Sequence, residues 1–146
     1  MTRNYIDPQT QKQRDRLMSM LNSLKAAGLK TYICKDSTEA YGMVTDGNDF
    51  INLSGAAYGY GITVSFDYRP TIKCGTGCCL GDSLLGITKD ITIDDFRNWV
   101  MEGRSLARKY GAVLYSDVTG PYVGEKDTPL EKYKRISGCF NLYKEY

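Results

Sequence analysis

The stretch from Ile62 to Tyr68 constrains the fold more than any other feature of the sequence. Its residues alternate between two kinds, the apolar Ile62, Val64, Phe66 and Tyr68 and the polar Thr63, Ser65 and Asp67. Because successive side chains of a strand point to opposite faces, this period of two predicts a strand with one buried face and one wet face. The chain should therefore contain a sheet with other elements packed against one side.

Three further strands are predicted before this one, at residues 29–36, 40–45 and 50–53. The second and third are joined by Asp46-Gly47-Asn48. Asp-Gly and Gly-Asn pairs favour tight hairpins because they tolerate positive φ. A last strand is predicted over Ala112–Tyr115.

The first helix is predicted from Asp7-Pro8, with Asp7 as the N-cap and Pro8 at the first helical position, where its missing N–H costs nothing. Leucines repeat at helical spacing from Leu17 to Leu24, and Gly28 is expected to end the helix.

Two more helices are predicted downstream. The first begins at about Ile93, after a capping box formed by Thr92 and Asp95. Gly103 is expected to weaken its middle and to bend or divide the helix. The second is short and opens at Thr128-Pro129-Leu130-Glu131, with Gly138 as its end.

The predicted order of elements is α-β-β-β-β-α-β-α. It indicates an α+β fold: a mainly antiparallel sheet of about four to five strands with helices on one face. No linker or internal repeat divides the chain, so residues 1–146 are expected to form a single domain.

The sequence contains no histidine, which excludes Ser-His and Cys-His nucleophiles and removes the commonest zinc ligand. No apolar run approaches the roughly 20 residues that span a bilayer, and the start of the chain does not resemble a secretory signal. Five cysteines, an odd number, fit the reduced thiols of a cytosolic protein. We therefore expect a cytoplasmic protein that is not an enzyme.

Three cysteines lie close together at Cys74, Cys78 and Cys79, in a loop that contains Gly75-Thr76-Gly77. The favoured interpretation is three small reduced side chains and no cofactor. One alternative is a zinc or redox module centred on these thiols, although a second pair of cysteines at zinc-ligand spacing is missing. A further alternative is a phosphate- or nucleotide-binding enzyme that uses the Gly-Thr-Gly loop.

The tyrosines at Tyr58 and Tyr60 lie in a glycine-rich stretch, Gly55–Gly61, with no helical or strand pattern to bury them. Exposed tyrosine-glycine loops resemble protein-binding loops. Direct binding of nucleic acid is disfavoured because the loop has no interleaved Lys or Arg. Packing of the two rings against the sheet edge remains an equal alternative.

Charge is segregated along the sequence. Residues 1–30 carry six Lys/Arg and two Asp/Glu, a net +4, whereas residues 36–103 carry ten Asp/Glu and four Lys/Arg, a net −6. Such a pattern can create a field with two poles. The same charge pattern also arises when charged side chains simply face solvent on helices and strands.

Several motifs resemble those of small uncharacterised proteins of phages and plasmids, over roughly residues 30 to 80. They are Ala40-Tyr41, Thr45-Asp46-Gly47, Gly61, Ser65, Arg69-Pro70 and Gly75-Thr76-Gly77. Cys78 departs from this pattern, since relatives commonly have an aromatic residue there. The resemblance implies a fold and an origin in a mobile element, and it transfers no catalytic residue because the family has no assigned activity.

This origin suggests a function in binding. Small phage proteins often bind a host enzyme, and anti-CRISPR inhibitors are similar to this chain in size. The acidic segment 36–103 would compete for the basic nucleic-acid channel of a CRISPR nuclease, because such channels hold phosphates largely by charge. No membrane partner is expected. The residues expected to bind the partner are Asp46, Asp49, Tyr58, Tyr60, Asp67 and Asp82.

Overall fold

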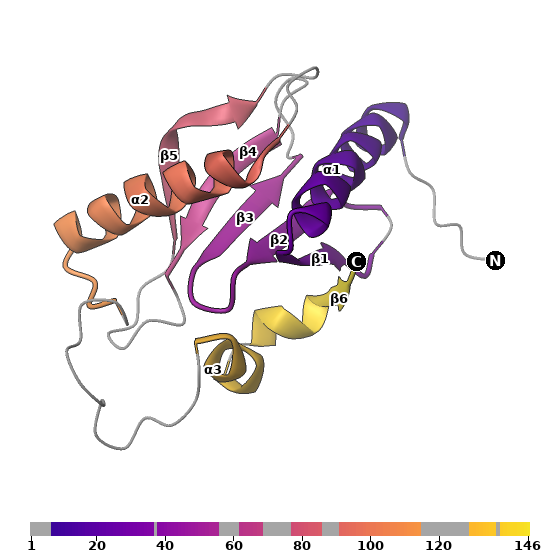
Figure 1. The fold of residues 1–146 in the computed structure, drawn as a ribbon. Helices are drawn as coiled ribbons and strands as arrows, with labels where there is room; N and C mark the ends of the chain where they lie inside the picture. Colours follow the sequence, from indigo (N-terminus) through magenta and orange to yellow (C-terminus); the bar gives the residue numbers. More distant parts are fainter. Residues whose placement is uncertain are drawn as a thin grey trace.

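The computed structural model describes residues 7–36, 38–55, 62–68, 77–85, 91–114, 129–136 and 138–146. Their elements follow in chain order (Figure 1): α1 (Pro8–Ala26), β1 (Lys30–Cys34), β2 (Tyr41–Thr45), β3 (Phe50–Ser54), β4 (Ile62–Asp67), β5 (Gly77–Leu85), α2 (Ile93–Lys109), α3 (Pro129–Ile136), a 3-10 helix (Gly138–Leu142) and β6 (Tyr143–Glu145).

Six strands of the described residues form one sheet in the order β5-β4-β3-β2-β1-β6, and every neighbouring pair is antiparallel. The predicted hairpin joins β2 to β3. Gly47 has φ +101° there, and the Asp46 carboxylate accepts hydrogen bonds from the backbone N–H groups of Asn48 at 2.9 Å and Asp49 at 2.8 Å. The α+β class and the antiparallel sheet are confirmed.

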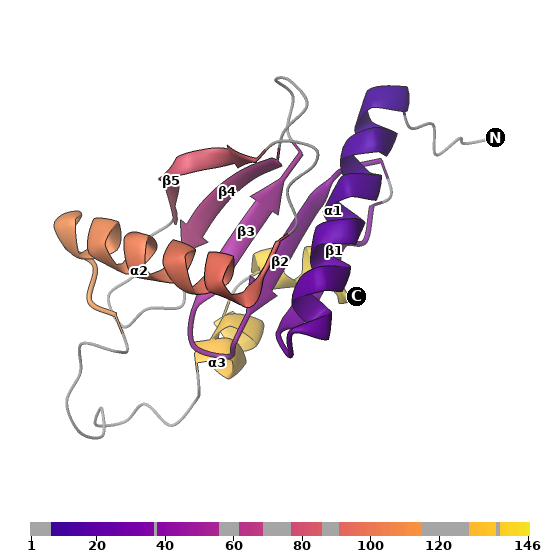
Figure 2. The same ribbon diagram turned by 45° about the horizontal axis from the view of Figure 1, so that its top comes forward.

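Helices α1 and α2 cover one face of the sheet (Figures 1 and 2). Side chains of both helices join one apolar core with the inward residues of β1 to β4, among them Ile33, Val44 and Ile51. The predicted leucine stripe of α1 is fully buried in this core, with Leu17 and Leu24 both 0% exposed. Burial of this stripe fixes which side of α1 faces the sheet.

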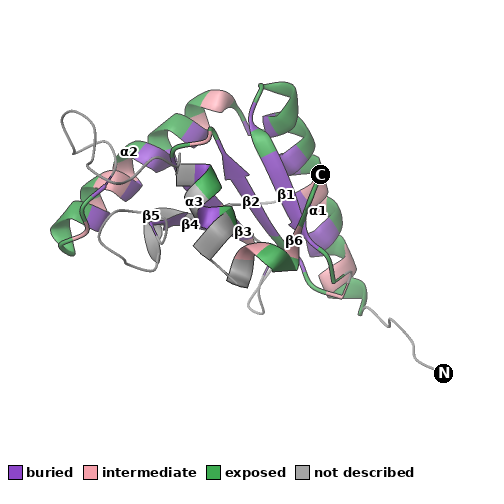
Figure 3. Cartoon of the chain, turned by 90° about the horizontal axis from the view of Figure 1, so that it is seen from below, coloured by how far each residue is buried: buried purple, intermediate pink, exposed green. Residues whose placement is uncertain are grey.

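Helix α3 packs against the opposite face (Figure 3). Its Leu130 and Tyr133 form a second apolar cluster with Tyr32, Met43 and Phe50. These three strand residues precede the inward-facing Ile33, Val44 and Ile51 by one position, so they point to the other side of the sheet. The expectation that the helices share one face is therefore correct for α1 and α2 and wrong for α3.

Helix α2 begins with the predicted capping box. The N–H of Asp95 donates to the Thr92 hydroxyl at 3.3 Å, and the N–H of Thr92 donates to the Asp95 carboxylate at 2.9 Å. The helix continues without interruption through Gly103, so the expected division at this residue is absent. A Cβ at Gly103 would overlap the ring of Phe66, which shows that this glycine lets the helix approach the sheet.

Pairing at the sheet edges differs from the prediction. Residues 112–114 contain no strand, whereas β5 occupies Gly77–Leu85, part of the region expected to be a cysteine loop. The unpredicted β6 pairs with β1 through Tyr32–Glu145, Ile33–Lys144 and Cys34–Tyr143. Both additions are edge strands, whose pairing depends on partners distant in the sequence rather than on a local pattern.

Candidate functional site

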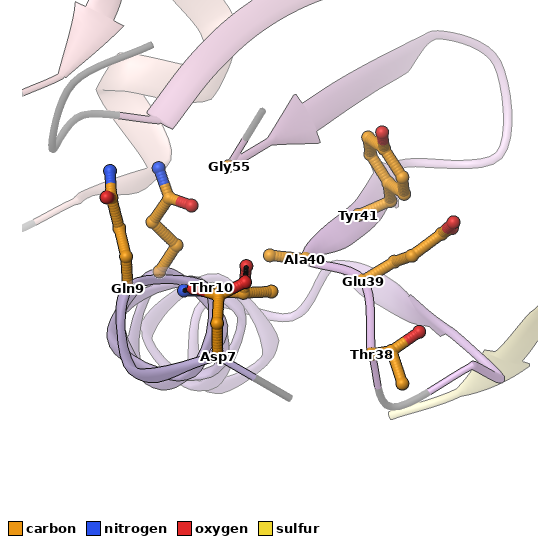
Figure 4. Close-up of a pocket in the computed structure, with 9 residues that line it drawn as sticks. Asp7, Gln9, Thr10, Thr38, Glu39, Ala40, Tyr41 and Gly55 are labelled. Atoms are coloured by element: carbon orange, nitrogen blue, oxygen red, sulfur yellow. Dashed lines mark hydrogen bonds between the residues drawn. The ribbon is translucent and has the colours of Figure 1, made fainter. Parts of the chain in front are cut away.

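A polar cavity of about 330 Å³ lies between the start of α1 and the segment that joins β1 to β2 (Figure 4). Its lining comes from three parts of the chain: the N-cap Asp7 with Gln9, Thr10 and Gln13 of α1, Thr38, Glu39, Ala40 and Tyr41 around the start of β2, and Gly55 after β3. Neighbouring strands of the sheet are antiparallel, so the end of β1, the start of β2 and the end of β3 lie at the same end of the sheet. This brings the three segments together.

On the helix side, Asp7 caps the first turn of α1. Its carboxylate accepts hydrogen bonds from the backbone N–H of Thr10 at 2.9 Å and from the Thr10 hydroxyl at 2.8 Å. These bonds, the backbone one first, lower the pKa of Asp7 below its ordinary value. The site where an external anion would bind a helix N-terminus is thus already taken by a side chain of the same chain.

On the opposite side, Asp36 and Arg14 shape the turn before β2. The Asp36 carboxylate accepts hydrogen bonds from Thr38 N–H at 2.9 Å and from the Thr38 hydroxyl at 2.7 Å, and these lower the pKa of Asp36. The buried Arg14 guanidinium donates to the carbonyl oxygens of Cys34 at 3.3 Å, of Asp36 at 3.2 Å and of Glu39. Arg14 therefore holds the turn against α1.

The floor of the cavity is closely packed. Gly55 donates its N–H to the carbonyl of Ala40 at 2.8 Å. A Cβ at Gly55 would lie 2.8 Å from Cβ of Gln13 and 2.9 Å from Cβ of Ala40, closer than carbon atoms approach. The absence of a side chain at residue 55 therefore lets β3 end directly against α1.

Glu39 and Tyr41 form the outer rim. Both are exposed, and Figure 4 shows both side chains extending away from α1. The thiol of Cys34 donates a hydrogen bond to Oε2 of Glu39, with 3.9 Å between sulfur and oxygen. Asp7 and Glu39 line the cavity, and Asp36 lies on the adjoining turn, where the charge of Arg14 also acts on it. Within the described residues, none of these three carboxylates forms an ion pair.

The acidic residues expected to bind a partner do not lie together at this cavity. Asp46 is exposed at the tip of the β2–β3 hairpin, which is at the opposite end of the sheet. Asp49 is 6% exposed and Asp67 is 1% exposed. Burial rules out both as surface contacts, and the expectation that they bind a partner is corrected.

Asp49 and Asp67 instead stabilise the fold. Asp49 forms an ion pair with Arg104 of α2, in which Nε of Arg104 donates to Oδ1 at 3.1 Å. Asp67 accepts hydrogen bonds from the Asn52 amide at 3.0 Å and from the Tyr133 hydroxyl at 2.9 Å. The first contact joins the hairpin to α2, and the second joins α3 to the sheet.

The stability that Asp49 contributes should depend on pH. Burial raises the pKa of Asp49, and Arg104 offsets this only in part, while Asp46 and Arg108 act more weakly and in opposite directions. The folded chain thus binds a proton at Asp49 more tightly than the unfolded chain, so this contribution grows as pH falls through the raised pKa and is lost as pH rises.

Urea unfolding of the wild type and of Asp49→Asn checks this between about pH 7 and about pH 4. The free energy of unfolding of the wild type, minus that of the variant, should increase toward the acid end. Asp94→Asn removes an exposed carboxylate of α2 and serves as the matched control. A difference that shrinks on acidification would contradict the assignment.

The remaining predicted residues lie wholly or partly outside the described part of the chain. Tyr58, Tyr60 and Cys74 are not among the described residues. The backbones of Cys78, Cys79 and Asp82 belong to β5, but their side chains are not described. Within the described ranges, no group of three His, Cys, Asp or Glu side chains is placed to hold a metal ion.

The sequence did not indicate that the carboxylates of Asp7, Asp36 and Glu39 lie at or next to one cavity. The sequence indicated Asp7 only as the N-cap of the first helix, and the structure confirms that it caps α1. Nothing in the pattern of residues 35–41 indicates that this segment meets the start of α1, since the contact depends on the position of α1 across the sheet. The leucine stripe of α1 leaves Arg14 for the solvent side of the helix, and the structure corrects this expectation, since Arg14 is buried against the turn before β2.

In the part of the chain that the structure describes, no helix has the length and apolar character needed to cross a membrane. Comparison of the chain with protein-family models, with curated proteins and with solved structures finds no match.

Proposed function

We propose that this chain acts in the cytoplasm of a host cell by binding and inhibiting a defence protein, a CRISPR nuclease, and that it catalyses no reaction of its own. The observation that carries the proposal is the cavity lined by Asp7 and Glu39, with the exposed Asp36 bound to its lining residue Thr38. None of these three carboxylates forms an ion pair within the described residues. The likeness of the central motifs to small phage and plasmid proteins supports the choice of partner.

Charge provides the mechanism. A nuclease channel that holds nucleic-acid phosphates is lined by Lys and Arg, so an acidic surface competes for it. The lowered pKa values of Asp7 and Asp36 keep both side chains ionised well below neutral pH. The exposed Lys12 and Lys35 lie in the same two segments but do not line the cavity.

A cleavage assay tests the proposal. Increasing amounts of the protein should suppress DNA cleavage by a purified CRISPR nuclease, and the inhibition should weaken as salt rises, since salt screens exposed charges. The double variant Asp36→Asn/Glu39→Gln should raise the concentration needed for inhibition by on the order of tenfold. Asp7 is left in place because it caps α1.

The matched control is Asp94→Asn/Glu145→Gln, which removes two exposed carboxylates outside the lining of the cavity and should inhibit like the wild type. Failure of the protein to suppress cleavage by each nuclease of a panel would refute the proposed function. Equal inhibition by both double variants would refute the role of the cavity carboxylates.

A further inference from the structure

We draw no further inference here: the strongest candidate, the strip of sheet surface beside α3 on which Tyr41, Ser54 and Thr63 lie at least partly exposed, supports no proposal, because nothing in the described part of the chain shows what covers it.

Discussion

Replacing Gly103 with alanine should destabilise the protein by about 3 kcal/mol, the upper end of the usual cost of overpacking a core. The new Cβ would overlap the ring of Phe66, a core residue that is only 2% exposed, so either the ring or helix α2 must move. This cost exceeds the gain of about 1 kcal/mol that alanine normally brings over glycine in a helix. Urea unfolding measures the difference.

Ser105→Ala is the matched control, since Ser105 is exposed on the same helix and its substitution should change the free energy of unfolding by no more than about 0.5 kcal/mol. Shortening the neighbour in the double variant Gly103→Ala/Phe66→Leu should recover part of the loss, because the two sites are in contact. A Gly103→Ala protein as stable as the wild type would show that the helix does not need its close approach.

Replacing Tyr133 with alanine should cost about 4 kcal/mol, as for other large aromatic side chains removed from a core. Tyr133 is 0% exposed, its ring centroid lies 5.0 Å from that of Phe50, and its hydroxyl donates to Asp67 at 2.9 Å. Loss of the ring should release α3 from the sheet, and hydrogen exchange at residues 130–136 should then accelerate in step with the loss of stability.

Tyr133→Phe separates the hydroxyl from the ring. It keeps the packing and removes one donor to a buried carboxylate, which should cost about 2 kcal/mol. Glu131→Gln, an exposed change on the same helix, is the control. If Tyr133→Ala lowers stability no more than Tyr133→Phe, the ring contributes nothing to the attachment of α3.

Local signals predicted the start of two helices correctly. Asp7-Pro8 begins α1 and Thr92 with Asp95 begins α2, because a cap is formed by residues within one turn of each other. The same holds for the Asp46-Gly47 hairpin. The edge strands β5 and β6 escaped prediction, since their pairing with β4 and β1 joins residues that no local pattern connects.

The acidic residues also show which features the sequence could predict and which it could not. The sequence predicted an acidic segment, but it treated Asp46, Asp49 and Asp67 alike. The structure leaves Asp46 exposed, pairs Asp49 with Arg104 and covers Asp67 with Tyr133. A carboxylate is available to a partner only if the fold has neither buried it nor paired it with a cationic side chain.

By itself, the sequence determined the strand Ile62–Asp67, with one apolar and one polar face, and the caps that start α1 and α2. Those features depend on spacing within a few residues. Only the tertiary structure decided that the polar Asp67 lies beneath α3, and that Asp7 and Glu39 line one cavity. Burial of a polar side chain depends on which distant element packs over it, and this is settled when the helices dock on the sheet.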